Sequence, residues 1–277
     1  MTYATVMVSL ALDESNEARL DAAGQIAERF DAGIVGIVAA QFSPPLYFTS
    51  GQFAQEMIDQ GRASIKKRIG ELELQFRAAT KDRAKQVEWR SAIDFPARYI
   101  LQHARCADII ISGGDKGAFS DPFVQASAKD LVMEAGRPLL IVPDSVTWLD
   151  LRSVLVAWKD TPEARRAIAD SLPMLRKARD VTVAEIPEAG GSRSAAVLRV
   201  RDVAAWLSRH GVSASELVPE ANEDRNAIAQ LDGIAADVGA GVIVAGAYGH
   251  SRFRELILGG MTQHLITQSA RCVLLSH

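Results

Sequence analysis

The chain has 277 residues, of which 48% are hydrophobic and 23% are charged, and its formal net charge is -3. This length suits two domains of roughly 130 to 140 residues, each large enough to bury its own core. A charge balance so close to neutral gives no large basic surface, which argues against nucleic acid as a main partner.

The first half of the chain alternates strand and helix signals. An apolar run of strand length over 6–12 is followed by Ser15, a suitable helix cap, and by a helical stripe over 20–30. Residues 33–38 then predict a second strand. No basic segment precedes the first apolar run and Asp13 ends it, so we expect a cytoplasmic protein with neither a signal peptide nor a membrane span.

The rest of this half adds a loop, two helices and two strands. Residues 41–51 contain prolines and aromatic residues and form either a surface loop, which we favour, or a lid over the sheet edge. An apolar stripe over 53–76 predicts a long helix interrupted by Gly61 and Gly70. The remaining predicted elements are a short helix near 97–104 and strands over 107–113 and 138–142.

The same order of elements returns in the second half. Residues 154–158 predict a strand, Pro162 suits the first position of the helix that follows, and 181–184 predict the next strand. The remaining predicted elements are helices over 196–207 and 228–238 and strands over 240–246 and 271–275.

Two matches between the halves indicate a duplication. Glu17-Ala18-Arg19 recurs as Glu163-Ala164-Arg165, 146 positions later. The last two strands of the first half match the last two strands of the second half at a constant offset of 133 positions, since residue 107 falls on residue 240. A repeated α/β unit is the simplest account of both matches.

We therefore predict an α/β protein of two tandem doubly wound domains. Each domain is a five-stranded parallel sheet with four helices on its two faces, in a Rossmann-like arrangement. The predicted domains are 1–143 and 152–277, joined by a linker over 143–152. Cys106 and Cys272 lack metal-ligand spacing and are interpreted as small core residues in a reducing compartment, which argues against a zinc site.

The strand at 242–245 ends in a glycine-rich loop, and an apolar helix follows that loop. Ligands of open parallel sheets lie beyond the carboxyl ends of the strands, where glycines let backbone N–H groups approach an anion at a helix N-terminus. The candidate binding residues are Gly246, Gly249, Gly259, Gly260, Met261 and Thr262. The alternative is that these glycines serve only as turns and caps of the fold.

This loop resembles that of the nucleotide-binding universal stress proteins, which carry Gly-x2-Gly-x9-Gly followed by Ser or Thr. Gly246, Gly249 and Gly259 fill the three glycine positions. Gly260 stands at the hydroxyl position, and Thr262 offers a hydroxyl two residues later. The substitution at Gly260 is a departure from the pattern of the family's ATP binders.

A second departure concerns the acidic residue that the family's nucleotide binders place after the first strand, near the nucleoside. The first half has Asp13 there, whereas the second half has Lys159, which either pairs with an anion or is solvated. In the first half Gly113 matches the first loop glycine, but Lys116 and Ala126 fall on the other two glycine positions. Binding is therefore assigned mainly to the second half.

The resemblance implies an adenine nucleotide alpha hydrolase-like fold and a ligand such as ATP or another adenine nucleotide, with Mg²⁺ only as the companion of the nucleotide. It also implies that the last strands of the two halves, 139–142 and 272–275, pair as a pseudo-dimer within the chain. A further homodimer stays open.

The leading hypothesis is a tandem universal stress protein that binds an adenine nucleotide or similar anion in its second domain and acts in stress signalling rather than fast catalysis. The sequence offers no Ser-His-Asp order, nucleophile elbow or Walker loop, so no catalytic residue is assigned. His250 and His264 flank the loop as acid-base candidates. A ligand-free interaction scaffold and a slow ATPase are the alternatives.

Overall fold

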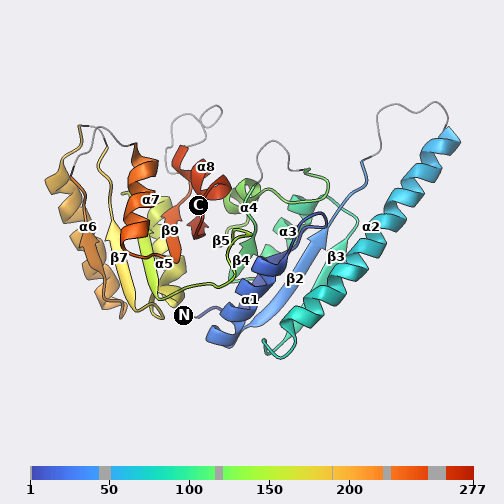
Figure 1. The fold of residues 1–277 in the computed structure, drawn as a ribbon, viewed down its shortest axis with the longest axis horizontal. Coiled ribbons are helices and arrows are strands. Elements are labelled where there is room, and N and C mark those ends of the chain that lie inside the picture. The colour runs from blue at the N-terminus through green and yellow to red at the C-terminus, as the bar shows by residue number, and fades with distance from the viewer. Residues whose placement is uncertain (1, 44–50, 116–120, 189, 221–225, 249–259) are drawn as a thin grey trace. The chain divides into compact units, whose positions relative to one another are not determined.

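The fold is described from a computed structural model, which covers residues 2–43, 51–115, 121–188, 190–220, 226–248 and 260–277 (Figure 1). The chain divides into two compact units. The first unit is Tyr3–Arg137, and the second contains Pro138–His277. This division places residues 138–143 with the second unit, whereas the sequence-based domains assign them to the first.

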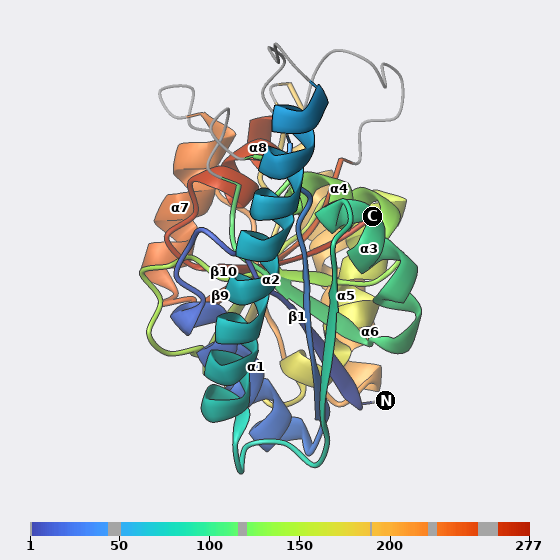
Figure 2. The same ribbon diagram turned by 90° about the vertical axis from the view of Figure 1, so that its right-hand side faces the viewer.

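The first unit is a parallel sheet covered by helices on both faces. Its strands are β1 (Thr5–Ser9), β2 (Gly33–Ala39), β3 (Val87–Ala92) and β4 (Ile109–Ser112), in the order β3-β2-β1-β4. Its helices are α1 (Glu17–Phe30), α2 (Gly51–Thr80), α3 (Pro96–His103) and α4 (Ala128–Glu134), and a single 3-10 turn, η1 (Ala104–Cys106), follows α3. Helices α1 and α2 cover one face of this sheet, and α3 and α4 cover the other (Figure 2). That division follows from right-handed crossovers that leave β1 in opposite directions.

Helix α2 is continuous through both glycines that were expected to interrupt it. Gly70 is exposed, and an added Cβ would have no neighbour within 4 Å. At Gly61 the ring of Phe42 takes the place of a side chain, because an added Cβ would lie 2.3 Å from Phe42 Cδ2. One glycine is therefore a tolerated weak point of the helix, and the other makes room for a neighbouring ring.

The start of α1 also differs by one residue from the expected position. The helix cap is Asn16 rather than Ser15, although Ser15 Oγ accepts a 3.4 Å hydrogen bond from Glu17 N. The Asn16 side chain is buried and bonds both the N–H and the carbonyl of Ala11. It ties the loop after β1 to the helix, a role that spacing alone does not reveal.

The second unit repeats this architecture and carries one extra strand. Its strands are β5 (Leu139–Ile141), β6 (Ser153–Ala157), β7 (Asp180–Ala184), β8 (Ser215–Leu217), β9 (Val242–Gly246) and β10 (Cys272–Ser276). Its helices are α5 (Pro162–Leu175), α6 (Arg193–Arg209), α7 (Ala227–Asp237) and α8 (Gly260–Thr267). The strand order is β8-β7-β6-β9-β10-β5, and all pairs except the last are parallel.

Strands β5 and β10 pair antiparallel, with Leu140 opposite Leu274. The pairing of these two segments was expected, and it explains why the compact second unit begins at Pro138. Pro162 stands at the start of α5 as predicted, behind the cap Thr161. The prediction of two tandem α/β domains built on parallel sheets is confirmed, with the β5–β10 pair as the antiparallel exception. None of the helices in the described ranges combines the length and the apolar character that a bilayer span requires.

Candidate functional site

Strands β6 and β9 mark the point where the strand order of the second unit reverses. They are hydrogen-bonded neighbours, with Ala157 opposite Ala245, and the chain proceeds outward from them in opposite directions. Ligands of doubly wound sheets bind beyond the carboxyl ends of such a pair. Lys159 follows β6 and Gly246 ends β9, so these two sequence-predicted residues lie at this edge.

Gly246 has a packing role of its own. An added Cβ would lie 2.4 Å from the backbone N of Ala164 and 2.6 Å from the carbonyl carbon of Glu163, both in the first turn of α5. Only glycine lets the end of β9 approach this helix so closely. The requirement holds with or without a ligand.

Thr262 connects the end of β9 to the last helix. Its Oγ1 accepts a 3.2 Å hydrogen bond from the backbone N–H of Tyr248, and Thr262 is buried. Tyr248 has a φ of 59°, a left-handed conformation that turns the chain after the strand. The Thr262 hydroxyl therefore holds the turn, and Met261 beside it is half-buried.

Gly260 begins α8 and is exposed. An added Cβ would meet none of the described residues within 4 Å, so close packing against that part of the chain does not require a glycine here. No described residue places a side-chain acceptor on the first N–H groups of α8. Gly249, Gly259 and His250 lie outside the described residues.

Lys159 is engaged in an ion pair. Its Nζ lies 2.6 Å from Glu188 Oε1, and both side chains are largely exposed, at 46% and 70%. Exposed pairs of this kind contribute little to stability and exchange partners easily. The Lys159 ammonium is therefore held at the sheet edge while staying open to competition from another anion.

Two buried polar atoms at this edge escaped the sequence analysis. Trp158 is 8% exposed, and its indole Nε1 is buried without an acceptor among the described residues. Glu163 Oε2, in the first turn of α5, is buried without a donor among them. Unsatisfied buried groups are costly and call for an explanation. One donor and one acceptor thus lie at the strand-order reversal without a described partner.

Solved structures with the same two-unit fold provide the comparison. A universal stress protein from Archaeoglobus fulgidus aligns with a TM-score of 0.66 at 16% identity, over 98% of this chain and 97% of its own. The chain has the fold of a universal stress protein. A functionally unknown protein from Pseudomonas aeruginosa aligns with a TM-score of 0.57 at 14% identity, over 99% of this chain and 92% of its own. No protein-family model and no curated protein matches the sequence.

The first unit of this universal stress protein fold fills the equivalent helix terminus with its own carboxylate. Asp115 Oδ1 accepts a 2.7 Å hydrogen bond from Ala128 N, and Asp115 Oδ2 accepts one of 2.9 Å from Ser127 Oγ. Ser127 Oγ in turn accepts from Lys129 N at 3.2 Å and caps α4. A chain carboxylate thus satisfies the amides that an anionic ligand would use.

The space beside Gly113 in the first unit is also occupied by a side chain. An added Cβ at Gly113 would lie 2.4 Å from Arg19 Nη2. Arg19 is 2% exposed and is paired with Glu14, whose side chain is 10% exposed. The Glu-Ala-Arg match between the halves therefore hides a difference, since the equivalent Arg165 is exposed and paired with Asp160.

The remaining candidates have structural partners. Asp13 is ion-paired with Arg68 of α2, and His264 Nε2 lies 3.0 Å from Asp232 Oδ2. Cys272 is buried, and burial raises the pKa of its thiol to about 12, whereas Cys106 is only half-buried and was wrongly expected in the core. Within the described ranges, no three His, Cys, Asp or Glu side chains gather in a way that would hold a metal ion.

Proposed function

We propose that the chain is a tandem universal stress protein that holds an adenine nucleotide in its second unit and serves in signalling. This proposal rests on the contrast between α4 and α8, the last helices of the first and second units. Helix α4 is capped by Asp115 and Ser127. At the start of α8, the position equivalent to Ser127 is Gly260, which has no side chain, and an added Cβ there would meet none of the described residues within 4 Å. Amides at such a helix start favour phosphate oxygens.

The buried polar atoms of this edge suit the nucleoside part of such a ligand. Glu163 Oε2 is an acceptor for a ribose hydroxyl, and Trp158 Nε1 is a donor for a ring nitrogen or a ribose oxygen. A neutral sugar is compatible with both groups, whereas a phosphate group placed beside Glu163 would be repelled by its carboxylate. Glu163 thereby supplies the acidic group that Lys159 does not.

The proposal is tested with two substitutions at Gly260, measured by isothermal titration calorimetry of the full chain with ADP and with Mg-ATP. Gly260→Asp places a carboxylate where the phosphate would lie, and we expect affinity to fall by about tenfold or more. Gly260→Ser restores the hydroxyl of the family pattern, so affinity should stay equal or rise. The Cβ that both substitutions add would meet none of the described residues within 4 Å.

Stability controls separate binding from folding. An Asp in the first turn of α8 is favourable to the helix, so the thermal midpoint of the ligand-free Asp variant should equal or exceed that of the parent chain. Binding that survives Gly260→Asp would contradict the proposed site. Absence of binding in both the parent chain and the Ser variant would favour a ligand-free scaffold. ATP turnover that is unchanged in the Asp variant would exclude catalysis at this site.

A further inference from the structure

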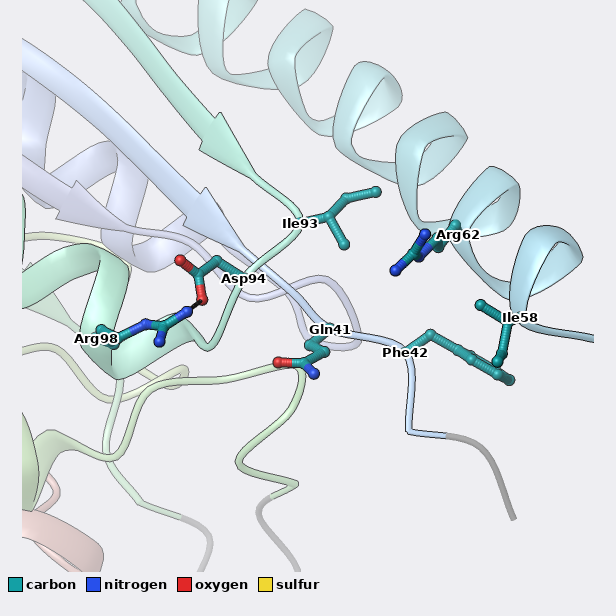
Figure 3. Close-up of a pocket in the computed structure, with 7 residues that line it drawn as sticks. All are labelled: Gln41, Phe42, Ile58, Arg62, Ile93, Asp94 and Arg98. Atoms are coloured by element: carbon teal, nitrogen blue, oxygen red, sulfur yellow. Dashed lines mark hydrogen bonds and ion pairs between the residues drawn. The ribbon is translucent and has the colours of Figure 1, made fainter. Parts of the chain in front are cut away.

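The first unit contains a cavity of about 340 Å³ at the carboxyl edge of its sheet, and none of its lining residues belongs to the proposed nucleotide site (Figure 3). Its walls come from the segments that follow β2 and β3, and from α2 and α3. This volume lies in the range of small-molecule sites, which begins at about 300 Å³.

One wall of this cavity is apolar and fixed by close packing. Phe42 follows β2, and its ring lies against the backbone of α2 at Gly61, where no side chain would fit. Ile58 of α2 and Ile93 after β3 complete the apolar lining, and both are half-exposed. Figure 3 shows the ends of Phe42 and Ile58 converging. A ligand with a hydrocarbon or aromatic group would bury these half-exposed side chains, which is favourable because it removes apolar surface from water.

Among the described residues, the lining carries one positive charge that no carboxylate offsets. Arg98 is ion-paired with Asp94, and the pKa of Asp94 lies below its usual range mainly because of the hydrogen bond from Arg98. That pair is neutral as a unit. Arg62 reaches from α2 toward the cavity (Figure 3), and its guanidinium has no hydrogen-bond or ion-pair partner among the described residues.

The side chain of Gln41 is a second polar group in the lining of this cavity. Gln41 is fixed through its backbone, because its N–H donates to Phe123 O at 2.7 Å. Its side-chain amide has no partner among the described residues and lines the same cavity. An arginine and an amide can together bind the two oxygens of a carboxylate.

We propose that this cavity binds a small monocarboxylate with an apolar body, held by Arg62 and Gln41 and covered by Phe42, Ile58 and Ile93. The nearby Asp94 carboxylate disfavours a doubly charged phosphate, and the Arg62 guanidinium, which has no ion-pair partner among the described residues, matches a single negative charge. The ligand and the unit both differ from those of the proposed nucleotide site, so the two proposals succeed or fail separately.

The experiment uses the full chain and 3-phenylpropionate as the probe, with binding followed by two-dimensional NMR. We expect a dissociation constant of about 1 mM and shift changes that cluster on Gln41, Phe42 and Arg62. The neutral isostere 3-phenylpropionamide should bind about tenfold more weakly, since it lacks the charge that Arg62 recognises. Gly260→Asp should leave the binding of this probe unchanged.

Matched variants of α2 decide whether Arg62 carries the binding. Arg62→Met keeps an unbranched stem but removes the guanidinium, and it should weaken 3-phenylpropionate binding about tenfold. Lys66→Met, four residues further along the exposed face of α2, removes the same charge outside the cavity and should have no effect. The proposal is overturned by equal affinity for acid and amide, by full binding in Arg62→Met, or by shift changes that map elsewhere. Absence of binding at about 20 mM probe overturns it as well.

Discussion

At the scale of single residues, the pair Arg19–Glu14 distinguishes the first unit from the second. The side chain of Arg19 is buried at 2% exposure and that of Glu14 is 10% exposed, so each compensates a charge that is largely removed from solvent. We expect Arg19→Met to lower the free energy of unfolding by about 3 kcal/mol, because it removes the buried guanidinium that is ion-paired with Glu14. Urea titration of the full chain measures this change.

The control for that prediction is the exposed pair Asp13–Arg68 in the same unit. Its side chains are 51% and 37% exposed, so Arg68→Met should cost less than about 1 kcal/mol. The double variant Arg19→Met, Glu14→Leu should recover most of the loss, since it removes both charges together. Equal losses in Arg19→Met and Arg68→Met would contradict a special role for burial.

Sequence reasoning located some site residues and missed others for a physical reason. Gly246 and Lys159 could be placed because each directly follows a strand, and the ends of parallel strands share one edge. The unpaired atoms of Trp158 and Glu163 could not be found, because a hydrogen-bond deficit depends on three-dimensional neighbours. The burial of Arg19 was likewise hidden by a motif that both halves share.

At the scale of elements, α2 offers the same substitution with opposite expected effects. Gly70→Ala should raise the free energy of unfolding by about 0.5 to 1 kcal/mol, since the site is exposed and alanine is the better helix former. Gly61→Ala should lower it by about 1 kcal/mol, because the new methyl group meets the Phe42 ring. Thermal and urea unfolding of the two variants provide the measurement.

The two glycines also show what an element can reveal in sequence. The apolar stripe predicts the helix correctly, and helix propensity predicts a weak point at each glycine. Propensity does not distinguish a glycine with open space from one that carries a neighbouring ring, so the expected interruptions were wrong. A stabilising effect of Gly61→Ala would show that Phe42 leaves α2 easily and that the apolar wall of the cavity is not fixed.

At the scale of the whole molecule, the repeated order of elements follows from periodicity and the internal match. The limits of the compact units do not, because they depend on which strand covers β10. A strand's assignment to a unit is decided by its hydrogen-bonded neighbour, and β5 belongs with β10 although it follows β4 in the chain. The internal sequence match aligns β5 and β10 as equivalent strands of the two halves. It does not show which compact unit β5 belongs to.

This arrangement predicts different behaviour for two fragments of the second unit. Fragment 138–277 keeps β5 on β10, and its outermost strand is only three residues long, which discourages further pairing. Fragment 143–277 retains the buried Leu149 and Leu151 but leaves the edge of β10 without a partner. We expect the first to be monomeric and the second to dimerise or aggregate through β10. Size-exclusion chromatography with light scattering distinguishes the two.

A peptide control ties the association to the exposed strand rather than to partial unfolding. Adding a synthetic peptide that contains residues 138–142 should return fragment 143–277 to the monomer, because the peptide restores the missing strand. Leu140→Pro in that peptide places a proline in the middle of the strand, at the residue opposite Leu274, and should abolish the rescue. If fragment 143–277 were monomeric without the peptide, β5 would not be needed to protect the edge of β10, and the compact second unit would begin after β5.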